Sequence, residues 1–142
     1  MLVQLLYASR AASPVTAEMI DSILQQSRTK NPEFGITGVL CHGGDVFMQL
    51  LEGGRTPVND LYNTIVRDAR HQKVMLLCYR EVSERRFGSW TMGQVRLDRI
   101  NTSLLLKYSE RPELDPFSVS GNASMALLDE LLVTAQVIGR AG

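Results

Sequence analysis

The stretch VFMQLLEGG, residues 46–54, is typical of a β-strand that runs into a glycine turn, with a glutamine among its apolar residues. Alternate side chains of a strand share a face, so Gln49 points to the same side as Phe47 and Leu51. The residues between them are apolar as well, and we expect both faces to be buried. A buried carboxamide left unpaired costs roughly 1–3 kcal/mol. Gln49 therefore needs a hydrogen-bonding partner on its own face.

The flanking segments place this strand in a larger sheet. An apolar run at 36–42 precedes it across Gly43-Gly44-Asp45, which predicts a β-hairpin. Apolar runs at 2–8, 73–80 and 89–97 predict three more strands, and helical periodicity predicts helices over 16–30 and from Pro57 to Ala69. The order β-α-β-β-α-β-β predicts an α+β fold, a ferredoxin-like sandwich whose mixed five-stranded sheet carries two helices on one face.

The residues after this unit no longer follow its pattern of alternating strands and helices. We divide the chain into a domain over 1–97 and a C-terminal helical extension over 98–142, with helices predicted at 102–108 and 122–138. The extension is too short to hold a core of its own. Its apolar side is expected to pack on the sheet face opposite the first two helices, or on a second subunit.

Composition excludes several classes of partner. Lys plus Arg and Asp plus Glu each total 15, so the net charge is zero and no nucleic acid partner is indicated. The opening MLVQLLYASR does not resemble a signal peptide, and no apolar run is long enough to span a membrane, so we expect a soluble, cytoplasmic protein. Cys41 and Cys78 fit reduced, packed thiols, and no metal site is predicted.

Three polar residues in apolar or helix-terminal positions are candidates for a site: Tyr7, Asn31 and Gln49. In a ferredoxin-like sheet the first and third strands are neighbours, so Tyr7 and Gln49 can lie side by side on one face. Each residue also has an ordinary interpretation when taken singly. Tyr7 could be a core tyrosine, Asn31 a helix cap, and Gln49 a solvent-facing residue of an edge strand.

Four ordered motifs resemble the BLUF family of blue-light sensors that use FAD, and in particular its short stand-alone members of the PixD type. The motifs are LLYASR at 5–10, NPEFGITGVLCHGGDVFMQLLEG at 31–53, IVRDARH at 65–71 and ERRFGSWTM at 84–92. The likeness spans residues 1–97, and LKYS at 106–109 continues it.

The resemblance implies that a flavin, usually FAD with FMN or riboflavin as alternatives, is bound between the two helices. It implies that Asn31 contacts the ring edge, that Asp68 accepts from ribityl hydroxyls and that Arg70 donates to a ring carbonyl. The full implied set of cofactor-binding residues is Tyr7, Lys30, Asn31, Phe47, Gln49, Ile65, Arg67, Asp68, Arg70 and His71. Without the other motifs, RDARH would be read as a solvated helix end.

The resemblance also implies a function, with Tyr7 and Gln49 as the photoactive pair. Blue light moves an electron and a proton from the tyrosine to the flavin, the radical pair recombines, and the glutamine ends in a new hydrogen-bonded form by rotation or tautomerisation. Trp90 and Met92 are implied to carry the signal out of the sheet. The protein is then a photoreceptor with no substrate turnover, which signals through the C-terminal helices to a protein partner or a homo-oligomer, a dimer or larger ring.

Two other functions fit the same fold. One is a regulatory ligand-binding domain without photochemistry, which would be colourless when purified. The other is an acylphosphatase-like hydrolase, but ASRAASP at 8–14 lacks the glycines that an anion cradle in the first loop needs.

Overall fold

The computed structural model describes residues 1–88, 91–113 and 115–133. Its centre is a five-stranded sheet in the order β4-β1-β3-β2-β5, built from β1 (Leu2–Ala11), β2 (Thr37–Gly43), β3 (Val46–Gly54), β4 (His71–Val82) and β5 (Gly93–Arg96). The first four strands pair antiparallel, and β5 is added parallel to β2 at one edge. This is the ferredoxin-like order with one extra strand, so the predicted fold is confirmed.

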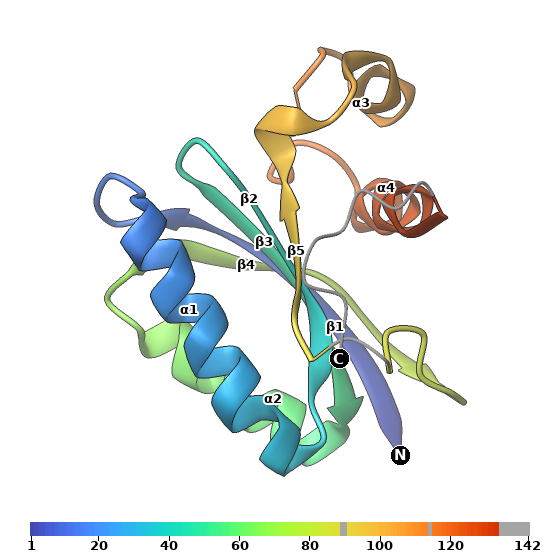
Figure 1. Ribbon diagram of the computed structural model, residues 1–142. Helices are drawn as coiled ribbons and strands as arrows, with labels where there is room; N and C mark the ends of the chain where they lie inside the picture. Colours follow the sequence, from blue (N-terminus) through green and yellow to red (C-terminus); the bar gives the residue numbers. More distant parts are fainter. Residues whose placement is uncertain (89–90, 114, 134–142) are drawn as a thin grey trace.

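The two faces of the sheet are covered by different helices (Figure 1). Helices α1 (Ala17–Lys30) and α2 (Arg55–Arg67) cover one face, and α3 (Thr102–Tyr108) and α4 (Gly121–Val133) lie on the other. Side chains of β1 and β3 alternate between the two cores: Leu5 and Leu51 pack under α1 and α2, whereas Leu6 and Leu50 pack under the tail helices. The extension therefore packs on the sheet face opposite α1 and α2, one of the two expected arrangements.

Local sequence signals explain where α1 begins and ends. The Thr16 hydroxyl caps the helix by accepting a hydrogen bond from the Met19 amide at 3.1 Å. Asn31 closes it, and the short 3₁₀ helix η1 (Asn31–Phe34) follows because Pro32 ends the α-helical pattern. Gly35 then adopts a φ of +68°, a left-handed turn that glycine adopts without strain. These features place Asn31 at the end of α1, beside the sheet.

The last predicted strand, 89–97, was wrong in extent. Strand β5 covers only Gly93–Arg96 and is followed by a 3₁₀ turn, η2 (Leu97–Arg99), so Met92 lies just outside the strand. The Met92 carbonyl accepts hydrogen bonds from the Arg28 guanidinium at 3.0 and 3.3 Å, so the main chain there is held by α1. Trp90 lies outside the described residues.

The other boundaries differ from prediction in smaller ways. Strand β4 is longer than the predicted 73–80, and α2 ends at Arg67 rather than near Ala69 because the Asp68 carboxylate accepts the Arg70 amide in a local turn. The predicted helix over 122–138 is observed as α4, and residues 134–138 lie outside the described part. Within the described residues, no helix is long and apolar enough to cross a membrane.

Candidate functional site

Tyr7 and Gln49 form a buried pair on the sheet face that α1 and α2 cover. Their Cα atoms are register partners in the β1–β3 ladder, as predicted from the expected strand order. The Tyr7 hydroxyl donates to Gln49 Oε1 at 2.5 Å, and both side chains are buried. Burial raises the pKa of Tyr7 well above its usual range, and the Asp68 carboxylate adds to the effect. The phenol therefore keeps its proton, and Gln49 accepts it in a hydrogen bond.

The second partner of Gln49 is a methionine. Gln49 Nε2 donates to Met92 Sδ at 3.4 Å, and Met92 is fully buried. A thioether is a weak acceptor, so this end of the carboxamide is only loosely satisfied. Because an amide carries its donor and acceptor at opposite edges, turning Gln49 over would exchange its partners without any change of charge.

A cavity of about 490 Å³ opens between α1 and α2 above this pair. Tyr7 and Gln49 line it from the sheet, and Lys30, Asn31 and Ile65 line it from the helices and their ends. The volume falls within the range of small-molecule sites. Eight of the ten predicted cofactor-binding residues line this cavity: Tyr7, Lys30, Asn31, Gln49, Ile65, Asp68, Arg70 and His71.

Asn31 has an unsatisfied donor in this cavity. The side chain is 5% exposed, and its Nδ2 has no hydrogen-bond partner. Its main-chain carbonyl accepts from the amides of Gly35 and Ile36, so the backbone of the residue is fixed while the amide group remains unpaired. A buried orphan donor is costly in a folded protein, and it calls for an acceptor from a bound molecule.

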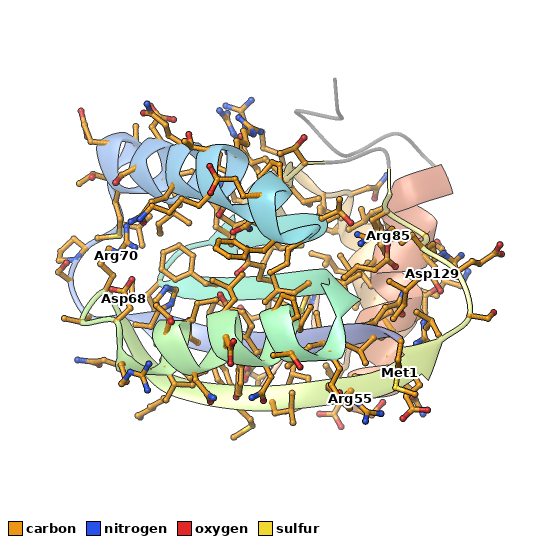
Figure 2. The ribbon with its side chains drawn as sticks, turned by 90° about the horizontal axis from the view of Figure 1, so that it is seen from below. Met1, Arg55, Asp68, Arg70, Arg85 and Asp129 are labelled. Atoms are coloured by element: carbon orange, nitrogen blue, oxygen red, sulfur yellow. The ribbon has the colours of Figure 1, made fainter. Side chains whose placement is uncertain are left out.

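Asp68 and Arg70 lie together at one end of the cavity, between α1 and α2 (Figure 2). The Arg70 guanidinium binds both Asp68 oxygens, at 2.7 to 3.1 Å, and also donates to Gln26 Oε1 of α1 at 3.0 Å. The Arg70 hydrogen bonds hold the pKa of Asp68 below its usual value, and Asp68 raises the pKa of Arg70. The pair bridges the gap between the two helices.

Phe47 and Arg67 are not among the cavity-lining residues. Phe47 is fully buried, and its ring packs against that of His71 with centroids 5.1 Å apart. Arg67 is exposed in the last turn of α2. His71 itself reaches the cavity, and its Nδ1 is 2.7 Å from the Ser9 hydroxyl. Burial lowers the pKa of His71, which favours the neutral ring.

Several cavity residues were missed by the sequence reasoning. From α1 these are Ile23, Gln26 and Ser27, and from α2 they are Thr56, Pro57, Asp60, Leu61 and Thr64, joined by Phe34 and Ile36. Helical spacing could have found several of them, because Ile23 and Ser27 precede Lys30 by one or two turns and Asp60 precedes Thr64 by one. Their polar groups suit hydroxyl-rich parts of a ligand.

The cavity residues fit a flavin. A ring with carbonyl and imide groups supplies the acceptor that Asn31 lacks, and apolar walls such as Ile23 and Ile65 suit a flat aromatic system. Charged and hydroxyl groups at Asp68, Arg70 and Thr64 suit a polar side chain of the ring. This geometry defines a ligand-binding domain built on a ferredoxin-like sheet.

Comparison with known proteins identifies the kind of ligand-binding domain. The family model of BLUF, sensors of blue-light using FAD, matches residues 2–93, and the chain belongs to this family. The photoactivated adenylate cyclase subunit alpha of Euglena gracilis is 35% identical over 88 residues, which are 62% of this chain and 9% of that protein. The blue light- and temperature-regulated antirepressor BluF of Escherichia coli is 32% identical over 88 residues, 62% of this chain and 22% of that protein.

Solved structures agree with this assignment over nearly the whole chain. The photo-activated state of BlsA superimposes with a TM-score of 0.83 at 30% identity, covering 94% of this chain and 96% of that one. The dark state of BlrB, a BLUF protein, gives 0.79 at 29% identity with the same coverage. The chain spans only about 12% of the length of the photoactivated adenylate cyclase beta subunits of Euglena. It covers 96% of the BlsA and BlrB chains.

Proposed function

We propose that this chain is a blue-light photoreceptor in which Tyr7 and Gln49 are the photoactive residues and FAD is the bound chromophore. The observation that carries the proposal is the buried Tyr7–Gln49 hydrogen bond of 2.5 Å at the floor of a cavity whose wall holds the unpaired Asn31 amide. Asn31, Asp68 and Arg70 would hold the flavin, with Lys30 and His71 at its margins. Phe47 supports the site from outside the cavity lining by packing against His71.

The bound flavin supplies the absorption of blue light and a transient acceptor for one electron and one proton. Tyr7 is oxidisable and holds a transferable proton in its hydrogen bond to Gln49. Gln49 can rotate or tautomerise, and its weak bond to Met92 Sδ leaves its Nε2 free to exchange that partner for another acceptor. The new hydrogen-bonded form of Gln49 is the stored signal. The cycle consumes no substrate, so the protein acts as a sensor rather than an enzyme.

The C-terminal extension is the proposed output. Helix α4 packs on the sheet face opposite the cavity, with Met125, Leu128 and Leu131 in contact with the core behind Tyr7 and Gln49. A change in the strands is therefore transmitted to α4 by direct packing. We propose that residues 98–142 pass the signal to a protein partner or to another copy in a homo-oligomer.

An absorption spectrum of the purified protein before and after blue illumination tests the proposal. We expect flavin bands that shift reversibly to the red under light. Gln49→Leu and Tyr7→Phe should each keep the flavin and lose the shift. A colourless protein would favour the ligand-binding alternative and sink the proposed function, and an intact shift in either variant would refute the role of that residue.

A matched substitution keeps this test specific. Met48→Leu changes the residue beside Gln49 that faces the opposite core, with little change in volume. We expect Met48→Leu to retain both the flavin and the light-induced shift. Loss of the shift in this control would mean that any disturbance of β3 abolishes the response.

A further inference from the structure

Glu52 is a buried carboxylate that the proposed photochemistry does not use. It lies on β3 three positions after Gln49, is 0% exposed, and faces the core under the tail helices. A buried charge is tolerated only when hydrogen bonds replace its lost hydration. Glu52 receives them from the Arg86 amide at 2.9 Å, the Phe87 amide at 2.8 Å and Gln4 Nε2 at 2.7 Å.

These bonds fix the connection between β4 and β5 to the central strand. Two of the donors are consecutive main-chain amides of that connection, so its path is held at Arg86 and Phe87. The Arg85 guanidinium adds bonds to the Glu52 carbonyl at 3.3 Å and to the Thr37 hydroxyl at 3.2 Å. A charged acceptor makes hydrogen bonds about twice as strong as a neutral one, so Glu52 is the principal anchor.

The same connection leads directly to the partner of Gln49. Met92 follows Phe87 by five positions, its Sδ accepts from Gln49 Nε2, and its carbonyl is bound by Arg28 of α1. The main chain is thus held by β3 at one end and by α1 at the other. Glu52 thus holds Arg86 and Phe87 from the face away from the cavity, while Arg28 holds Met92 from α1.

The connection also reaches the tail. Arg86 Nε lies 3.4 Å from Asp129 Oδ1 of α4, an ion pair at the molecular end opposite Asp68 and Arg70 (Figure 2). Phe87 is buried in the same core as Met125 and Leu128. The residues that Glu52 holds are therefore those that meet α4.

We propose that Glu52 is a positioning residue that, through Arg86 and Phe87, sets the position of Met92 against the Gln49 amide and so the lifetime of the light-switched state. The inference rests on the proposed function. Weakening the anchor loosens Met92, which lowers the barrier for Gln49 to return to its dark arrangement. Flavin binding is unaffected, because Glu52 does not line the cavity.

Glu52→Gln tests the inference. It keeps the shape of the side chain but replaces one carboxylate oxygen by an NH₂ group, which cannot accept from the main-chain N–H groups that face it. In darkness, we expect hydrogen exchange at the Arg86 and Phe87 amides to accelerate by roughly tenfold, the value of one hydrogen bond to a charged group. After illumination of the flavin-loaded protein, we expect dark recovery to be faster by about the same factor. Glu52→Asp, which keeps the charge but withdraws the oxygens, should give a smaller effect of the same sign and serves if Glu52→Gln does not fold.

Leu105→Ala is the matched control. Leu105 of α3 is buried in the same core, so its truncation should destabilise the protein without touching the Glu52 hydrogen bonds. It should lower Tm and leave the recovery rate unchanged. The inference would be overturned if Glu52→Gln recovered in the dark, and exchanged its Arg86 and Phe87 amides, at the wild-type rates. It would also be overturned if the recovery rate of Glu52→Gln changed no more than that of Leu105→Ala. If wild-type protein shows no light-induced shift, the proposed function and the lifetime effect both fall. A normal wild-type shift with unchanged recovery in Glu52→Gln removes the inference alone.

Discussion

Strand β3 places one buried polar residue on each face of the sheet, Gln49 toward the cavity and Glu52 toward the tail helices, and the two differ in how their polar groups are satisfied. On the cavity face, Gln49 has a weak sulfur partner and Asn31 Nδ2 has none. On the tail face, Glu52 is held by two amides and Gln4 within a continuous apolar core. Satisfied polar groups stabilise one arrangement, whereas unsatisfied ones leave room for a ligand and for a change of partner. The contrast predicts that truncating the packed core on the tail face lowers stability, whereas removing the unpaired Asn31 donor on the cavity face lowers flavin affinity.

The largest expected effect is on the tail face. Leu127 of α4 is fully buried in the core under the sheet, so Leu127→Ala leaves a cavity there. We expect a loss of about 3 kcal/mol in the free energy of unfolding. Urea denaturation of the flavin-free protein measures it. A loss below 1 kcal/mol, on the order of a surface substitution, would show that α4 does not complete this core.

The next largest effect is on the cavity face, where we expect flavin affinity to change and stability not to change. Asn31→Ala removes the orphan donor, so flavin affinity should fall about tenfold while the flavin-free protein loses no stability. Fluorescence titration with FAD measures the affinity, and thermal unfolding without FAD measures the stability. Unchanged affinity would mean that Asn31 is only a helix cap, which was its ordinary interpretation.

Alternation and topology made the centre of the site predictable. A glutamine in a doubly buried strand demanded a partner, and the ferredoxin-like order placed Tyr7 beside it, as the β1–β3 register shows. The same question applied to Glu52, a carboxylate in the same strand, would have pointed to the second polar network. Its donor Gln4 is the register partner of Glu52 on β1 and could have been found in the same way. The other two donors could not be foreseen, because they are main-chain amides of an irregular connection with no periodic signal.

Irregular segments account for the other differences. Met92 precedes β5 because Arg28, one turn before Asn31 on α1, binds its carbonyl, and no spacing rule links residues so far apart in sequence. The Asp68–Arg70 pair was predicted as two separate ligand contacts, yet the side chains bind each other. Short-range turns of this kind depend on side-chain rotamers, which a residue pattern does not specify.

A milder effect on the cavity face should appear with pH. Burial lowers the pKa of His71 below its ordinary 6.5, with Asp68 opposing the shift and Arg70 adding to it. The unfolded chain therefore binds a proton at a higher pH than the folded one, and stability should fall as pH decreases below about 6.5. Thermal unfolding from pH 7 to 5 measures this.

His42 is the internal comparison for that measurement. Its pKa is also lowered, mainly by burial and further by Arg96, so it contributes a loss of the same sign. In His71→Gln the decline in Tm below pH 6.5 should be smaller than in wild type but still present, because His42 remains. An equally steep decline in His71→Gln would contradict the assignment of a neutral, buried ring to His71.

The smallest expected effect compares two orphan polar atoms on opposite faces. Ser124 Oγ of α4 is fully buried without a partner, as Asn31 Nδ2 is, but it does not line the flavin cavity. Ser124→Ala removes an unsatisfied hydroxyl and adds a better helix former, so the free energy of unfolding should rise by about 0.5 kcal/mol. Flavin affinity should not change, in contrast with Asn31→Ala. If Ser124→Ala weakened flavin binding as Asn31→Ala does, the two faces would be coupled through α4 even in the dark, and the division between a stabilising face and a binding face would have to be abandoned.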